Sequence, residues 1–143
     1  MKLFFTILMS LFFFDNNSST VFSYNGKSIE VNASIGKKFV GTYKGAQGGY
    51  LELHADGTGF YKYDYAFGPC KNTPIPIQWG MIKDAKGSAV RFNRKYGQSY
   101  PIFFKSTAGA RFRGCKEEVL EDFLLVYKNG TIEVSTSDDW KKQ

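Results

Sequence analysis

The chain has 143 residues and carries 19 Lys and Arg against 13 Asp and Glu, so its formal net charge is +6. This length fits a single domain. An aromatic content of 17% excludes a disordered chain, which lacks the apolar bulk to bury. Fifteen Gly and only four Pro exclude a collagen-like or proline-rich chain. Composition therefore defines one folded domain and leaves its function open.

The first residues have the layout of a secretory signal peptide. A single positive charge, Lys2, precedes an apolar run that is shorter than the roughly 20 residues of a membrane-spanning helix. The small residue Ser23 suits the last position of such a leader, and Ala33 ends a later alternative. We therefore expect a leader over residues 1–23 and one mature domain over residues 24–143; an uncleaved anchor or a buried first strand is the alternative. The protein is expected to be secreted or periplasmic, without a transmembrane anchor.

Downstream of the leader, apolar residues alternate with a period of two, which is typical of β-strands. Gly, Asn and Asp separate the runs, as at the tight turns Asp56-Gly57 and Asn129-Gly130. The only helix-like piece is residues 116–122, about two turns long at most. The strands expected in chain order are residues 38–44, 50–54, 58–67, 75–83, 88–95, 100–105, 110–115, 123–128 and 131–135.

Alternation also assigns the faces of these strands. Leu51 and Leu53 are expected to face inward, and so are Val90 and Phe92. Consecutive short strands joined by tight turns favour an antiparallel meander. We therefore expect an all-β fold of eight or nine strands that forms a small barrel or a cupped sheet.

Export determines how the two cysteines are interpreted. Cys70 and Cys115 are expected to form a disulfide because an oxidising compartment favours pairing; two separate buried thiols are the alternative. The bond closes a loop of roughly 45 residues, which the chain-entropy model values at about 3–4 kcal/mol. No C-x-x-C motif occurs and the chain has a single histidine. We therefore expect no metal site and no cofactor.

Two segments resemble a known group of proteins. Gly41-Thr42-Tyr43, and the pattern Leu-x-Leu-x-x-Asp-Gly-Thr-Gly-x-Tyr from Leu51 to Tyr61, resemble the opening strands of small exported β-barrels of the lipocalin and avidin group. The resemblance covers about residues 37–67. That group opens with Gly-x-Trp, and here a tyrosine stands at the Trp position. The resemblance implies a lipocalin-like barrel or cupped sheet that holds an apolar ligand, and it does not identify the ligand.

The expected strand 58–67 is unusually rich in tyrosine. Tyr61, Tyr63 and Tyr65 share one face of it, and a tyrosine has an apolar body and a polar tip. Such a face suits a cavity wall or a recognition surface; a barrel interior simply filled by these rings is the alternative. The residues predicted to line a ligand cup are Phe39, Tyr43, Tyr61, Tyr63, Tyr65 and Trp79.

Positive charge is concentrated in one part of the chain. Between residues 83 and 116 there are nine Lys or Arg and one acidic residue. If the strands there are neighbours, they form a basic patch that suits an acidic protein, an anionic polymer or a phosphate-bearing surface; a solvated face is the alternative. Nucleic acid is not an expected partner of an exported protein without a matching motif. The predicted patch comprises Arg91, Lys95, Arg111 and Arg113.

The sequence does not favour an enzyme. It contains no Gly-x-Ser-x-Gly or His-Glu-x-x-His motif, and its single histidine, His54, adjoins a turn. The carboxylates Glu52 and Asp64 are more consistent with a β surface than with a glycosidase pair. The leading hypothesis is a non-catalytic exported protein that holds a small apolar or amphipathic ligand in a β-barrel cup. The alternative is a protein-binding module, an inhibitor or immunity-type protein, that uses the basic or the Tyr-rich face. The oligomeric state stays open.

Overall fold

The protein is described here from a computed structural model, over residues 19–45, 48–62, 74–107, 121–133 and 139–143. It is all-β with one short 3-10 helix, η1, over Ser34–Phe39. The strands are β1 Thr20–Tyr24, β2 Lys27–Asn32, β3 Gly41–Lys44, β4 Tyr50–Leu53, β5 Thr58–Lys62, β6 Ile75–Ile82, β7 Phe92–Arg94, β8 Gly97–Ser106, β9 Glu121–Tyr127, β10 Thr131–Glu133 and β11 Trp140–Lys142.

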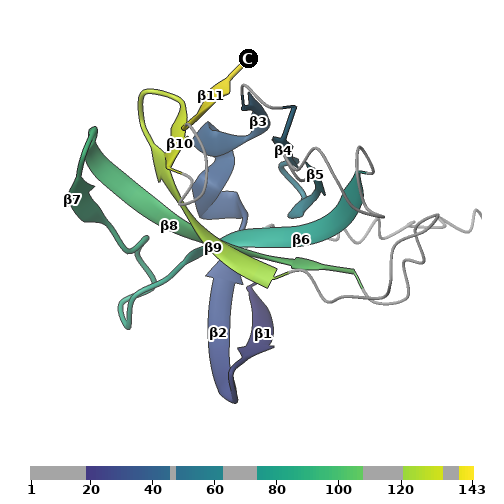
Figure 1. The fold of residues 1–143 in the computed structure, drawn as a ribbon. Helices are drawn as coiled ribbons and strands as arrows, with labels where there is room; N and C mark the ends of the chain where they lie inside the picture. Colours follow the sequence, from purple (N-terminus) through teal and green to yellow (C-terminus); the bar gives the residue numbers. More distant parts are fainter. Residues whose placement is uncertain (1–18, 46–47, 63–73, 108–120, 134–138) are drawn as a thin grey trace, which may run out of the picture.

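Eight of these strands close into an antiparallel barrel. Neighbours run in the order β6-β5-β4-β3-β11-β10-β9-β8, and β8 pairs with β6 to close the ring. Strands of the ring that follow one another in the chain are neighbours in the barrel, so the barrel is a meander (Figure 1). The one interruption is β7, which lies between β6 and β8 in the chain but is not part of the ring. The predicted fold class, a small all-β barrel with meander topology, is therefore confirmed.

The remaining strands extend the barrel wall. The β1–β2 hairpin continues from the end of β6, where Val31 pairs with Ile82. The β7 strand pairs only with the start of β8, at Phe92 opposite Ser99. Figure 1 shows these two extensions projecting from the barrel in different directions, β1–β2 at the bottom and β7 at the left.

Several predicted elements differ from the observed ones. Residues 38 and 39 end η1 instead of starting a strand. Of the expected strand 88–95, only residues 92–94 form a strand, β7. Phe92, which was predicted to face inward, is 49% exposed. A strand of three residues at the sheet edge has no second layer to cover it, which explains the exposure. The predicted strand 110–115 and residues 116–120 of the predicted helix lie outside the described residues. The last two residues of that predicted helix, 121 and 122, belong to β9.

The N-terminal hairpin was not predicted, although the sequence contains a signal for it. Asn25-Gly26 is a favoured two-residue turn, because both residues of a type I′ turn need positive φ, and here φ is 49° and 73°. The predicted end of the leader, after Ser23, falls within β1. The position of that boundary stays a prediction.

The two ends of the barrel are built differently. At one end, η1 and the short turns after β4 and β9 cover the opening, and Gly36 of η1 packs so close to Trp79 that an added Cβ would lie 2.9 Å from the ring. The other end carries the connections β3–β4, β5–β6, β8–β9 and β10–β11. The pairs Tyr61–Ile75 and Lys105–Glu121, for example, lie next to two of these connections. These ends are called below the plugged end and the loop end.

Inward-facing side chains fill the barrel. Leu51 and Leu53 are fully buried, as predicted. The barrel core consists of Phe39, Tyr43, Leu51, Leu53, Ile77, Trp79, Met81, Tyr100, Ile102, Phe104, Leu124, Val126, Ile132 and Trp140. Among the described residues, no helix has the length and apolar character needed to cross a membrane.

Candidate functional site in the barrel interior

Four of the predicted cup residues meet in the barrel interior. Phe39, Tyr43 and Trp79 are at most 2% exposed, and Tyr61 packs against the same core. Tyr63 and Tyr65 lie outside the described residues. The structure therefore brings together all of the predicted lining residues that it describes.

Three of them belong to the plugged half of the barrel, and the two that carry a polar side-chain atom, Tyr43 and Trp79, have it paired with backbone. The Tyr43 hydroxyl donates to the carbonyl oxygen of Phe39 at 2.8 Å, and the Trp79 indole N–H donates to the carbonyl oxygen of His54 at 3.0 Å. Burial raises the pKa of Tyr43 to about 12, because an apolar site disfavours the phenolate. These side chains hold the η1 segment and the β4–β5 turn on the barrel.

An aromatic stack lies nearer the loop end. The Tyr61 ring stacks on Phe104, with centroids 5.1 Å apart and planes inclined by 21°, and on Trp140, with centroids 5.8 Å apart and planes inclined by 28°. Phe104 and Trp140 are buried, whereas Tyr61 is only half-buried. Tyr61 is therefore the least buried member of the stack.

Trp140 carries the one unusual polar group of this stack. Its indole nitrogen is buried and has no hydrogen-bond partner, although Trp140 is only 1% exposed. The ring edge lies over Gly45 of the facing β3 end, where an added Cβ would come within 2.3 Å of that nitrogen. A buried donor without an acceptor costs about 1–3 kcal/mol. The stack thus presents an unused hydrogen-bond donor inside the barrel.

Sequence reasoning missed Trp140 because its strand is too short to alternate visibly. β11 has three residues, and it pairs with β10 on one side and β3 on the other. The place of β11 in the barrel depends on these two pairings. The available signal was a large aromatic residue followed by two lysines at the end of an otherwise polar tail.

The predicted basic patch is divided in the structure. Arg111 and Arg113 lie outside the described residues. The Lys95 ammonium pairs with the Asp139 carboxylate at 3.2 Å, and Tyr96 donates to the same carboxylate. Hydrogen bonding of Lys95 with Tyr96 first, and then with Asp139, raises the pKa of Lys95. Arg91 lies in a different environment, beside Tyr100. Of the two described members, Arg91 is the one that forms no ion pair with a described residue.

A hydrogen-bonded chain of side chains covers the β4–β5 turn. The two ring nitrogens of His54 lie 2.6 Å from Glu52 Oε1 and 3.0 Å from Thr58 Oγ1. The Thr58 hydroxyl donates to Asp56 Oδ1 at 2.7 Å, which, with the Thr58 backbone N–H, lowers the pKa of Asp56. Because the Thr58 proton is directed to a carboxylate and not to the histidine, this chain lacks the nucleophile–base geometry of a hydrolase. These hydrogen bonds stabilise the β4–β5 turn.

No three His, Cys, Asp or Glu side chains of the described segments gather as ligands for a metal ion. Comparison of the chain with protein-family models, with characterised proteins and with solved structures gives no significant match. The interpretation of the site therefore rests on its geometry.

Proposed function

We propose that the protein is an exported, non-catalytic binding protein whose barrel holds a small amphipathic ligand at the loop end. The observation that carries the proposal is the buried, unpartnered indole N–H of Trp140. A ligand with a carbonyl or hydroxyl oxygen would accept this hydrogen bond, and its apolar body would lie on the half-exposed ring of Tyr61. This combination of an apolar wall and one placed polar group is typical of small-molecule sites.

The side chains that fill the interior limit the positions at which such a ligand can bind. The plugged half of the barrel is occupied by Phe39, Tyr43 and Trp79, which expose at most 2% of their surface. A ligand therefore occupies the level of the stack and not the full depth of the barrel. Of the residues predicted to line a cup, Tyr61 contacts the ligand, and the other three described residues support it from below.

Two matched tryptophan variants test the proposal. Trp140→Phe keeps an aromatic ring and removes the unpaired donor, whereas Trp79→Phe removes a donor that is already bonded to His54. The probe is N-phenyl-1-naphthylamine with a carbonyl-bearing analogue of the same size, and binding is followed by fluorescence. We expect Trp140→Phe to weaken binding of the carbonyl analogue by about tenfold and to leave the affinity for the parent probe unchanged.

For the control variant, Trp79→Phe, we expect a change in stability and no change in affinity. Trp79→Phe lowers the stability of the barrel and leaves both affinities unchanged at a temperature where the protein is folded. Equal affinities of the wild type and Trp140→Phe for the carbonyl analogue would refute the role of the indole N–H. Native mass spectrometry of the protein from its natural host, with and without a co-purifying small molecule, tests ligand binding directly.

Export and a Cys70–Cys115 disulfide are part of the same proposal. Both cysteines lie outside the described residues, in the β5–β6 and β8–β9 connections. These connections start from the same barrel end, where Ile77 of β6 pairs with Ser106 of β8, and this supports the pairing. Intact mass that increases by two hydrogens on reduction is the expected result, and an unchanged mass contradicts the bond.

A further inference from the structure

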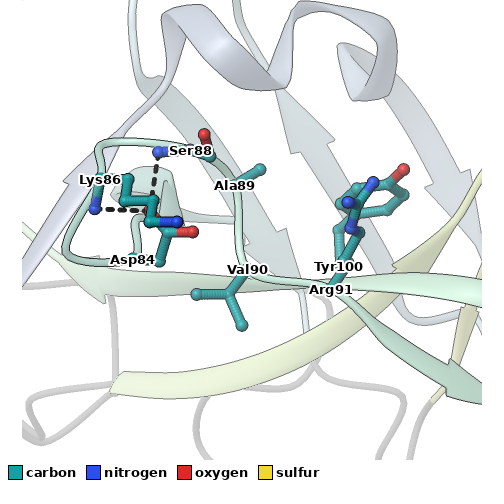
Figure 2. A pocket seen from close by; sticks show the side chains of 7 residues that line it. All are labelled: Asp84, Lys86, Ser88, Ala89, Val90, Arg91 and Tyr100. Carbon is teal, nitrogen blue, oxygen red and sulfur yellow. Dashed lines mark hydrogen bonds between the residues drawn. The ribbon is translucent and has the colours of Figure 1, made fainter.

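A concave site lies at the plugged end, where it reaches one residue of the barrel core, Tyr100. It is a pocket of about 620 Å³ between the segment 84–91 and Tyr100, a size within the usual range for small-molecule sites. Figure 2 shows Asp84, Lys86 and Ser88 grouped on one side of the pocket and Arg91 with Tyr100 on the other. Between these two sides lie two apolar residues, Ala89 and Val90.

The segment that forms this pocket is held in place by backbone hydrogen bonds. Asp84 N–H donates to the Ser88 carbonyl at 2.8 Å, Gly87 N–H to the Asp84 carbonyl at 3.0 Å, and Val90 N–H to the Ile82 carbonyl at 3.0 Å. An isolated bridge joins Lys83 to Ala89. The backbone of the segment is thus defined before any ligand arrives, which reduces the entropic cost of binding.

The acidic residue of the pocket is already engaged. One carboxylate oxygen of Asp84 accepts the backbone N–H groups of Lys86 at 2.8 Å and Ser88 at 3.0 Å (Figure 2). A carboxylate that accepts two backbone N–H groups stabilises its own turn. Its Oδ1 atom therefore shapes the segment.

The cations of the pocket, in contrast, are unengaged. Neither the Lys86 ammonium nor the Arg91 guanidinium forms an ion pair or a side-chain hydrogen bond with any described residue. A third cation is close, because the Lys38 ammonium lies 4.0 Å from the centroid of the Tyr100 ring. By comparison, four other cations of the described segments pair with carboxylates, namely Lys83, Arg94, Lys95 and Lys105.

From this arrangement we infer that the pocket binds a small organic anion, with Arg91 contacting its phosphate, sulfate or carboxylate and Lys86 adding positive charge from the opposite side of the pocket. An arginine guanidinium presents its N–H groups in a planar fork that suits oxyanions. The pocket is larger than an inorganic oxyanion needs, and Ala89, Val90 and the edge of Tyr100 accommodate an apolar body. This site is separate from the loop-end site and does not depend on it.

The test uses three probes of graded chemistry: inorganic phosphate, phenyl phosphate and the neutral benzyl alcohol. Binding is measured by amide chemical-shift changes in NMR at constant ionic strength. We expect phenyl phosphate to bind tightest and to shift the amides of residues 84–91. Arg91→Gln and Lys86→Gln, both at exposed positions, should each weaken it by about tenfold.

The matched control is Lys27→Gln, which removes an exposed cation at the tip of the distant β1–β2 hairpin. This variant should bind phenyl phosphate as the wild type does. Three results overturn the inference: no binding of any probe at millimolar concentration, equal weakening by Lys27→Gln, or unchanged affinity in Arg91→Gln. Binding of inorganic phosphate as tight as that of phenyl phosphate shows a free oxyanion as the ligand and overturns the organic part of the inference.

Discussion

Two neighbouring phenylalanines of β8 show how differently the two faces of the barrel wall are buried. Phe104 points inward and Phe103 points outward, and neither is exposed to solvent. Phe104 is enclosed because the barrel closes on itself. Phe103 is enclosed largely by the β1–β2 hairpin, with Phe22 at a centroid distance of 5.2 Å and Tyr24 at 5.6 Å, and by Phe123 of β9 at 4.8 Å.

The difference teaches that burial in this protein has two independent sources. The barrel core collects side chains from all eight strands of the ring. The outer cluster, in contrast, consists of Phe22, Val31 and Phe103 with Tyr24, Ile29 and Ile82 packed against it. Most of its members come from one N-terminal hairpin, so the outer cluster can be lost while the barrel stays closed.

The largest effect is expected for Phe104→Ala. Removing a fully buried phenylalanine costs about 3–5 kcal/mol, and here it also removes the ring on which Tyr61 stacks. The free energy of unfolding, measured in urea, should fall by this amount in one cooperative transition. Phe123→Ala, at a 37% exposed position of the outer face, should cost far less. Equal losses in the two variants would contradict the distinction between the two faces.

The next effect is expected when the chain starts at Tyr24 instead of Ser19. The shorter chain lacks the first four residues of β1, including Phe22, whose burial contributes roughly 2–3 kcal/mol. Stability should fall by that amount, and an apolar dye should bind the uncovered Phe103. Identical stability and dye binding of the two chains would show that β1 does not cover this face. The N-terminal residue of the protein from its host then shows whether the leader ends before β1.

A similar or smaller loss is expected for Gly80→Ala, which tests how the hairpin is seated. A Cβ at this outward position of β6 would lie 2.7 Å from Val31 Cγ2 and 2.9 Å from the backbone nitrogen of Asn32. Overpacking of this kind costs about 1–3 kcal/mol. Hydrogen exchange should accelerate for amides of β1 and β2 and stay unchanged for β3 and β4. Uniform acceleration over all strands would mean that hairpin and barrel open together.

The smallest effect concerns the pH dependence of the barrel core. Burial raises the pKa of Tyr43 to about 12, above the ordinary value near 10. The unfolded chain therefore loses this proton first, and stability present below about pH 10 is lost as the pH rises toward 12, by about 1.4 kcal/mol near pH 11. Tyr43→Phe should remove that part of the alkaline loss. Parallel pH profiles of the variant and the wild type would contradict the assignment.

Much of the barrel was predictable because, in its longer strands, the alternation of apolar and polar residues indicates which face is buried. Leu51 and Leu53 alternate with polar neighbours and are buried as predicted, and β6 spans nearly the whole of the predicted strand 75–83. Phe92 was predicted wrongly, because alternation shows which residues share a face and not whether another layer covers that face. It is 49% exposed at an edge.

The candidate sites were predictable only in part, for a related reason. The tyrosine-rich sequence around Tyr61 predicts it as a site residue. No such pattern indicates Trp140, whose place in the stack follows from two strand pairings. Likewise, Arg91 and Lys95 look equivalent in the sequence. Only the structure shows that Lys95 pairs with Asp139, 44 residues away, while Arg91 lines a pocket.

The sequence by itself determined the class of fold, because period-two alternation and tight Gly-containing turns are local properties that each strand carries alone. The tertiary structure decided what closes the barrel, which aromatic residues are core and which cations are unpaired. These properties depend on contacts between distant segments, such as Lys142 of β11 with Tyr43 of β3. No local pattern encodes such contacts, since they exist only once the whole ring has formed.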